Sequence, residues 1–267
     1  MRTVETIADA RAALAPLRSG TIGLVPTMCA LHEGHLALVA AARKECDTVV
    51  ASIFFNPAQF GPGEDIGRYP RDLEHDAKAA EAAGVDVLFT PSPEELYPPG
   101  FSTWVEVEEL SHVLEGAYRP GHFRGVATVC LKLFAIVRPG RVYFGRKDAQ
   151  QVAVIRRLIR DLDLEVELRA VETVRDADGL ALSSRNRNLS ADERLAAVAI
   201  PRALAAGAAA YRTGADAAAA ARAALAEEPL VKTQYVEVAR FEGDLVLAAA
   251  ARVGATRLID NVSLADG

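Results

Sequence analysis

Two histidines, His32 and His35, stand three residues apart where a short apolar run gives way to a helical pattern. The run Ile22–Val25 predicts a buried strand, and Leu36–Arg43 predicts the helix that follows. Residues at i and i+3 of a helical turn lie on one face, and the first turn of a helix favours phosphate through its N–H groups and dipole. The second histidine comes one residue too early for a zinc-protease motif. The spacing indicates nucleotide chemistry, with capping or surface histidines as the alternative.

A second group of candidate side chains follows the predicted strand Val142–Gly145. Lys147 is suited to pair with a phosphate. Asp148 either holds Mg²⁺ or caps the helix that begins at Ala149. Gln151, further along that helix, either points back into the same site or lies on the helix surface.

A third group, Ser183, Ser184 and Arg185, lies in a loop that leads into the last third of the chain. Hydroxyl and guanidinium groups are good donors to phosphate, so this loop is a candidate phosphate clamp. The alternative is a turn with a helix cap, which is common for serine-rich loops.

Neutral amides form the fourth group, Asn56 and Gln59, beside the aromatic residues that end another predicted strand. Such amides suit the orientation of a small polar organic substrate, although Asn-Pro is also ordinary turn chemistry. The fifth segment, Arg119–Val126, is basic and contains glycine, and it reads either as a surface turn or as a flap over an anionic ligand. Four of the five groups fall at strand ends of one predicted sheet or on the loop that leaves it.

The elements that would position these groups alternate between strand and helix, which predicts an α/β fold with a doubly wound parallel sheet. Ligands of such sheets bind beyond the carboxyl ends of the strands. The expected strands are Ile22–Val25, Thr48–Phe55, Val85–Phe89, Val142–Gly145 and Val166–Val171, and the expected helices are Leu36–Arg43, Leu73–Ala83, Cys130–Val137 and Ala149–Asp161.

After about Val174 the sequence becomes rich in alanine, with apolar and arginine residues interleaved as in packed helices. We therefore expect an N-terminal, Rossmann-like domain over residues 1–174 and a smaller C-terminal α+β domain over 175–267 that closes over the site. Its expected helices are Asp192–Tyr211 and Ala215–Glu227, and its expected strands are Gln234–Val238, Leu245–Ala249 and Thr256–Asp260.

The composition of the chain indicates which kinds of partner and compartment to expect. The 267 residues are 51% hydrophobic and 25% charged, and the net charge of −6 argues against nucleic acid as the main partner. We expect no membrane partner, because no apolar run is long enough to span a bilayer. The start of the chain lacks the apolar core of a signal peptide, and three widely spaced cysteines suit reduced thiols, so we expect a cytoplasmic protein.

The ordered blocks resemble the pantothenate synthetase (pantoate–β-alanine ligase) family from end to end. The wider superfamily of cytidylyltransferase-like nucleotidyltransferases would share little beyond His-x-Gly-His and the Ser-Ser loop. The matching blocks are Pro26-Thr27-Met28-x-Ala30-Leu31-His32-Glu33-Gly34-His35, Asn56-Pro57-x-Gln59-Phe60, Tyr69-Pro70-Arg71, His122-Phe123-x-Gly125-Val126, Phe144-Gly145-x-Lys147-Asp148-x-Gln150-Gln151 and Asp178-Gly179-Leu180-Ala181-x-Ser183-Ser184-Arg185-Asn186.

The resemblance implies an AMP-forming ligase. The carboxylate of (R)-pantoate attacks the α-phosphorus of ATP, which releases diphosphate and forms pantoyl adenylate. The amine of β-alanine then attacks the acyl carbon, which gives pantothenate and AMP. The resemblance also implies a homodimer and Mg²⁺, with Asp76 as a neighbour of the metal.

Site roles follow from the same resemblance. The implied catalytic residues are His35, as proton donor, His32, Lys147, Ser183 and Arg185. The implied ATP contacts are Met28, Cys29, Ala30, Leu31, His32, Glu33, Gly34, His35, Gly145, Arg146, Lys147, Asp148, Val174, Leu182, Ser183, Ser184 and Arg185. The implied contacts to pantoate and β-alanine are Gln59, Gln151, Asn56 and Arg119.

Two residues depart from the family pattern. Cys29 replaces a glycine, which costs about 1–2 kcal/mol if this position needs a positive φ; otherwise Cys29 packs as a small hydrophobic residue. Leu182 replaces a methionine of similar volume, so we expect little effect. Two alternatives to a ligase stay open at this point: a nucleotidyltransferase that stops after transferring the nucleotide, and a nucleotide-sensing protein inactivated by Cys29.

Overall fold

The computed structural model describes residues 1–61 and 72–264. The Tyr69-Pro70-Arg71 block lies outside the described residues. The chain divides into two compact units, of which the first comprises Met1–Gly145 and Gln151–Val171 and the second comprises Arg146–Gln150 and Glu172–Gly267. None of the helices in the described part of the chain is long and apolar enough to cross a membrane.

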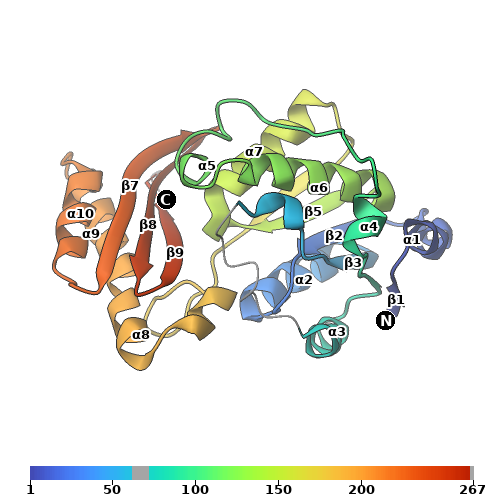
Figure 1. Cartoon of the computed structure of the whole chain (residues 1–267), viewed down its shortest axis with the longest axis horizontal. Coiled ribbons are helices and arrows are strands. Elements are labelled where there is room, and N and C mark those ends of the chain that lie inside the picture. The colour runs from blue at the N-terminus through green and yellow to red at the C-terminus, as the bar shows by residue number, and fades with distance from the viewer. Residues whose placement is uncertain (62–71, 265–267) are drawn as a thin grey trace. The chain divides into compact units, whose positions relative to one another are not determined.

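A parallel sheet with the strand order β1-β4-β3-β2-β5-β6 forms the centre of the first unit (Figure 1). From β2 the chain adds β3 and β4 on one side, then returns to add β5 and β6 on the other. This order confirms the predicted doubly wound fold, and its switch point lies between β2 and β5. The strands are β1 (Arg2–Val4), β2 (Ile22–Thr27), β3 (Thr48–Ile53), β4 (Val87–Phe89), β5 (Arg141–Gly145) and β6 (Glu167–Val171).

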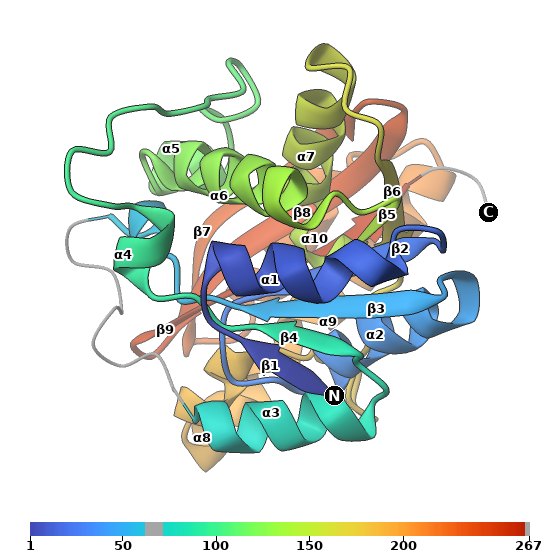
Figure 2. The same cartoon turned by 90° about the vertical axis from the view of Figure 1, so that its right-hand side faces the viewer.

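Helices cover both faces of this sheet. Figure 2 shows α1 and α6 on one side of the strands and α3 on the other. Alternate strand residues enter the two apolar clusters: Leu24 packs with α1, α6 and α7, whereas its neighbour Val25 packs with α2 and α3. The longer helices are α1 (Ile7–Leu14), α2 (Glu33–Glu45), α3 (Leu73–Ala82), α6 (His122–Val137) and α7 (Ala149–Asp161), and the short ones are α4 (Pro93–Leu96), α5 (Glu115–Tyr118) and the 3₁₀ turns η1 (Ala15–Leu17) and η2 (Pro57–Gln59).

Burial on both faces explains why the central strands were predictable, because they read as continuous apolar runs. The sequence-based interpretation missed β1, a three-residue edge strand that pairs with β4, and the helix α1 after it. It also began α6 at Cys130, eight residues late by the numbering of His122 and Cys130. The strand predicted over Thr48–Phe55 ends at Ile53.

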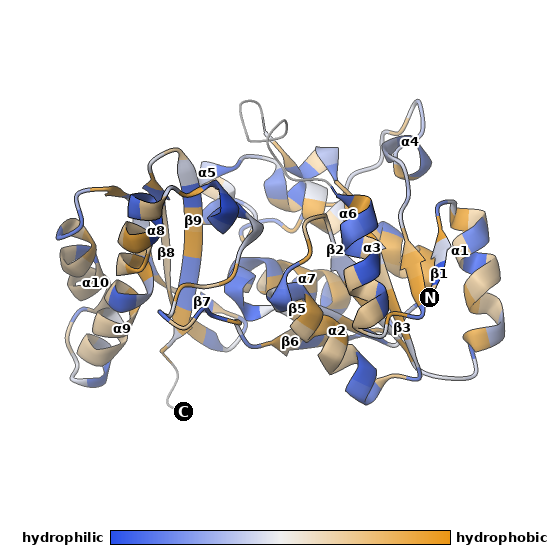
Figure 3. Ribbon diagram, turned by 90° about the horizontal axis from the view of Figure 1, so that it is seen from below, coloured by the Kyte–Doolittle hydropathy of each residue, from blue (hydrophilic) through white to orange (hydrophobic). Residues whose placement is uncertain are grey.

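An antiparallel sheet with the order β7-β8-β9 forms the centre of the second unit. Alanine and leucine residues of α9 and α10 pack with the sheet in one apolar cluster, and Figure 3 shows hydrophilic and hydrophobic residues interspersed along these helices. The elements are η3 (Arg146–Asp148), η4 (Ser184–Asn188), α8 (Ala191–Ala197), α9 (Ala199–Arg212), α10 (Ala217–Ala226), β7 (Val231–Phe241), β8 (Asp244–Val253) and β9 (Thr256–Ser263).

The single helix predicted over Asp192–Tyr211 is two helices, α8 and α9, which meet at Val198. Pro201 explains the break, because it has no N–H to donate to the carbonyl of Ala197. Proline is tolerated in the first turn of a helix, which is where α9 places it.

Candidate active site

The histidine turn, residues 28–35, connects β2 to α2. Thr27 ends β2 with its hydroxyl donating to the carbonyl of Ser52 in β3, at 2.6 Å. The backbone then passes through Ala30, whose φ of 56° lies in the left-handed region. His32 is the N-cap of α2 and has extended backbone angles. The turn therefore delivers both histidines to the carboxyl end of β2.

The two imidazoles close a reciprocal cap at the start of α2. The Nδ1 atom of His32 accepts the N–H of Gly34 at 3.1 Å, and the Nδ1 atom of His35 accepts the N–H of His32 at 3.3 Å. The ring centroids are 4.1 Å apart. Because each Nδ1 atom accepts, the neutral form of each ring carries its proton on Nε2. The cap thus presets two neighbouring N–H donors, which is the chemistry expected of a phosphate-binding pair.

Asp76, a fully buried residue of α3, holds the backbone of this turn. Its two carboxylate oxygens accept the N–H groups of Ala30 and Leu31, both at 2.7 Å. This carboxylate stabilises the left-handed residue and the approach to His32. The interpretation of Asp76 as a neighbour of Mg²⁺ finds no support in this geometry, and residues 1–61 and 72–264 contain no cluster of three or more side chains suited to a metal.

Cys29 does not need a positive φ, because the left-handed residue of the turn is Ala30. The Cys29 side chain is buried in the cluster that contains Val25, Leu38 and Val39. Of the two interpretations of this departure, the structure supports packing as a small hydrophobic residue, and strain at this position was the wrong one.

Asn56 and Gln59 occupy the turn after β3. The Nδ2 atom of Asn56 donates to Gln59 Oε1 at 3.0 Å, and Gln59 Nε2 donates to the sulfur of Met28 at 2.9 Å. The carbonyl end of the Gln59 amide therefore faces Asn56, and its N–H end faces the histidine turn. Two motifs that are separate in the sequence meet here, at the contact between Gln59 and Met28.

Asn56 itself has no remaining hydrogen-bonding capacity for a substrate. Its two N–H groups donate to Gln59 Oε1 and to the carbonyl of Gly125, and its oxygen accepts from the N–H of Ala58 and the hydroxyl of Tyr97. Burial raises the pKa of Tyr97 far above its usual range, which keeps this hydroxyl a donor. This arrangement favours a role in which the side chain of Asn56 orients Gln59 over the expected direct contact with pantoate.

The segment Arg119–Val126 is part turn and part helix: residues 119–121 form a turn in which Pro120 and Gly121 are exposed, and α6 begins at His122 with a mostly buried first turn. An added Cβ at Gly125 would lie 2.3 Å from the carbonyl oxygen of Ala58, so only glycine permits this approach. His122 Nδ1 lies 2.9 Å from the carbonyl oxygen of Gln59, and Arg119 Nη1 lies 3.0 Å from His122 Nε2. Arg119 thus lies beside the Gln59 turn.

Gln151, the other expected pantoate residue, lies in the first turn of α7 and is half-buried. The preceding strand β5 pairs in parallel with β2, so both strands end at the same edge of the sheet. Gln151 and the histidine turn therefore follow the two strands that flank the switch point.

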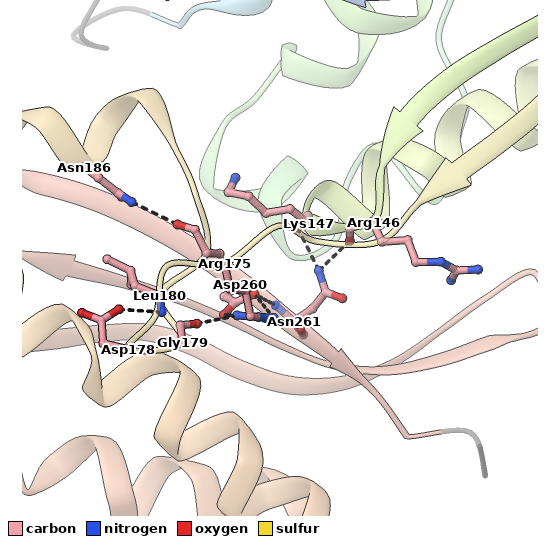
Figure 4. A network of polar contacts seen from close by, with 10 residues as sticks. Arg146, Lys147, Arg175, Asp178, Gly179, Leu180, Asn186, Asp260 and Asn261 are labelled. Atoms are coloured by element: carbon pink, nitrogen blue, oxygen red, sulfur yellow. Dashed lines mark hydrogen bonds and ion pairs between the residues drawn. The ribbon is translucent and has the colours of Figure 1, made fainter. Parts of the chain in front are cut away.

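In the second unit, the turn η3 carries Lys147, whose ammonium lies 3.5 Å from the carboxylate of Asp148. Arg146 pairs with Glu172 at 2.8 Å. The Nδ2 atom of Asn261 in β9 donates to the carbonyl oxygens of both Arg146 and Lys147 (Figure 4). The sequence-based interpretation did not identify Asn261, which has no motif of its own.

The serine loop, Ser183–Arg185, follows a short hairpin in the same unit. The N–H of Leu182 donates to the carbonyl of Val174 at 3.0 Å, and Arg175 forms an isolated bridge with Ala181. Ser183 Oγ accepts the N–H of Arg185, so the cap predicted as the alternative for this loop is present.

Ion pairs hold this hairpin. Arg194 donates to Asp176 and Asp178, and its hydrogen bond lowers the pKa of the Asp178 carboxyl. Arg175 forms a two-pronged bond to the buried carboxylate of Asp260 (Figure 4). Arg175 and Asp260 were missed by sequence reasoning because they pair across a long stretch of chain.

Comparison with known proteins finds relatives that match this chain over nearly its whole length. A family model described as pantoate-beta-alanine ligase matches residues 2–263. The chain is 53% identical over 292 residues to pantothenate synthetase of Acidobacterium capsulatum, covering 100% of this chain and 98% of the relative. It is 50% identical over 279 residues to pantothenate synthetase of Moorella thermoacetica, covering 99% of both.

Two solved structures extend the comparison. Pantothenate synthetase from Thermus thermophilus superimposes with a TM-score of 0.95 at 49% identity, covering 99% of both chains. Pantoate-beta-alanine ligase from Francisella tularensis, in complex with beta-gamma ATP and beta-alanine, superimposes with a TM-score of 0.84 at 34% identity, covering 100% of this chain and 99% of that one.

Proposed function

Because this chain belongs to the pantoate–β-alanine ligase family, it is an AMP-forming ligase of pantothenate biosynthesis, and we propose that its histidine turn carries the adenylation step. The observation that supports this role is the reciprocal cap, in which each Nδ1 atom accepts, so that the neutral form of each of the two adjacent imidazoles carries its proton on Nε2. Donors arranged before the reaction are a large catalytic contribution where negative charge develops.

In the first step, the carboxylate oxygen of pantoate forms a bond to the α-phosphorus of ATP while the bond to diphosphate breaks. His32 and His35 stabilise the charge on the phosphate oxygens, and His35 supplies a proton to the departing diphosphate. Lys147, Ser183 and Arg185 bind the phosphates through charge-assisted hydrogen bonds.

Two side-chain amides, those of Gln59 and Gln151, bind pantoate in this proposal. Gln59 donates from Nε2 to pantoate, and Gln151 holds the same molecule from the start of α7. The geometry that supports this is the orientation of the Gln59 amide, whose oxygen is engaged by Asn56. In the second step the amine of β-alanine, which binds near Gln59 and Arg119, attacks the acyl carbon and AMP leaves.

We propose that Mg²⁺ binds here through the phosphates of ATP and not through a set of protein ligands. The described residues offer no metal cluster, and Asp148, an acidic residue of the Lys147 segment, is paired with Lys147. Mg²⁺ commonly binds through substrate phosphates with few protein carboxylates. When bound, it would neutralise part of the charge on the departing diphosphate.

The same proposal includes a cytoplasmic location and a homodimer. The three cysteines all lie within the described residues, are buried and form no disulfide, which supports a reducing compartment such as the cytoplasm. A homodimer and a C-terminal unit that closes over the site are proposed from the family resemblance alone.

A coupled AMP-release assay tests the function. We expect AMP formation to require pantoate and β-alanine together with ATP. Repeated turnovers that release diphosphate but no AMP would indicate a nucleotidyltransferase, and nucleotide binding without turnover would indicate a sensor. Either result would contradict the ligase.

A further inference from the structure

Strand β9 contacts both of the ATP segments of the second unit. These segments are η3, which carries Lys147, and the serine loop Ser183–Arg185. They are far apart in the sequence, yet two adjacent residues of β9 serve both: Asn261 bonds to η3 directly, and Asp260 bonds to Arg175 in the hairpin that leads to the serine loop (Figure 4).

Asn261 holds η3 through its side-chain amide. The Nδ2 atom donates to the carbonyl oxygen of Arg146 at 2.9 Å and to that of Lys147 at 2.8 Å. A primary amide has two N–H groups, so a single side chain can bind both of these consecutive carbonyls. The backbone of Lys147 is therefore fixed to β9 on the carbonyl side.

Asp260 holds the hairpin that leads to the serine loop. Its carboxylate, buried to 3% exposure, accepts Arg175 Nη1 at 2.6 Å and Nη2 at 3.0 Å. Arg175 also donates to the carbonyl of Gly179 at 3.0 Å, within the hairpin. The hairpin strand that pairs with Arg175 continues through Leu182 into Ser183.

Asp260 and Asn261, which bind these two segments, are also bonded to each other. The backbone N–H of Asn261 donates to Asp260 Oδ1 at 2.8 Å. Both residues lie within the paired region of β9, where Asp260 is opposite Ala249 and Asn261 is opposite Ala248, two buried positions of β8. Pairing with β8 therefore fixes the positions of both residues that bind η3 and the hairpin.

We propose that Asn261 is a positioning residue for ATP, which holds Lys147 at a fixed separation from the serine loop that Asp260 and Arg175 anchor. This inference rests on the proposed function, since it takes Lys147 and the serine loop as ATP contacts. Holding two sets of donors at a set distance lowers the cost of ordering them when the triphosphate binds. Asn261 acts through Lys147 and does not touch the nucleotide.

The test is a double-mutant cycle in which binding is measured by calorimetry with α,β-methylene-ATP and, separately, with pantoate. Asn261→Leu removes both donors without adding charge. We expect it to raise the Kd for the ATP analogue about tenfold, the effect of losing hydrogen bonds of ordinary strength, and to leave the Kd for pantoate unchanged. In a Lys147→Ala background, the same substitution should change the Kd less than about twofold, because coupled residues are not additive.

Ser263→Ala, an exposed position on the same strand, is the control and should bind both ligands like the wild type. If Asn261→Leu does not fold, Asn261→Thr suits a strand and keeps the cycle usable. Equal losses for the ATP analogue and pantoate, additive effects with Lys147→Ala, or no loss of ATP affinity would each overturn the proposal. A wild type that binds the analogue but makes no pantothenate would refute the proposed function, while the binding cycle would still decide the role of Asn261.

Discussion

The histidine turn and the Lys147 turn both follow a strand of the parallel sheet, but they are stabilised by opposite chemistry. A buried carboxylate, Asp76, accepts two backbone N–H groups of the first turn. A neutral amide, Asn261, donates to two backbone carbonyls of the second. One turn therefore has its backbone donors engaged, and the other has its backbone acceptors engaged.

This difference explains which groups are left to act on phosphate. Because Asp76 engages the N–H groups of Ala30 and Leu31, these two backbone groups are not donors to a ligand, and the donors that we propose for this turn are the imidazoles. Where Asn261 binds two carbonyl oxygens, the groups it engages are acceptors, which cannot bind an anion. The residue that hydrogen-bonds the backbone of a turn therefore determines whether backbone N–H groups or side chains can donate to a ligand there.

The largest expected effect is at the histidine turn itself. His35→Ala removes one preset donor and should lower kcat about 10²–10³-fold, the usual cost of a donor to developing charge. It should leave the fold intact, because it removes only one capping bond. His112→Ala, at an exposed histidine, is the matched control. Turnover of His35→Ala like that of the wild type would remove His35 from the mechanism.

Asp76→Asn tests the support of the same turn. The new amide places an NH₂ group against one of two backbone N–H groups, so we expect a loss of stability of about 1–3 kcal/mol in urea unfolding and a clear fall in kcat. Asp72→Asn is the control, because Asp72 caps α3 and asparagine caps equally well. If both variants lose stability alike, Asp76 has no special role in the turn.

Asn56→Asp tests whether Asn56 orients Gln59. The new carboxylate cannot donate to Gln59 Oε1 or to the carbonyl of Gly125, so the Gln59 amide must turn. The Kd for pantoate should rise about tenfold, while that for the ATP analogue stays within about twofold. An equal weakening of both ligands would show that the substitution disturbs the sheet edge as a whole.

Cys29→Gly should have the smallest effect. Since Ala30, not Cys29, has the positive φ, a glycine relieves no strain and kcat/KM for ATP should change less than about twofold. Steady-state kinetics at saturating pantoate and β-alanine measure it. A large gain in activity would mean that the thiol hinders ATP.

The parts that sequence reasoning predicted are local in the chain. The central strands are continuous apolar runs because both faces of the sheet are covered, and His32 and His35 lie within one helical turn. Their partnership could be derived from spacing alone. The edge strand β1 could not, because three residues carry too little pattern.

The parts that were missed depend on contacts between distant residues. Asp76 reaches Ala30 across 46 positions, and Arg175 reaches Asp260 across 85. Asn56 was assigned to substrate because its residue type suits a ligand, whereas its four hydrogen bonds are visible only once the chain is folded. A residue type indicates what a side chain can do, but only its neighbours show what capacity is left.

The most direct test of an adenylating histidine turn is a single turnover of the wild type with ATP and pantoate in the absence of β-alanine. We expect diphosphate to be released in one rapid phase with about one equivalent per site, and AMP to appear only after β-alanine is added. Diphosphate release that waits for β-alanine, or a burst of unchanged rate in His35→Ala, would contradict adenylation at this turn.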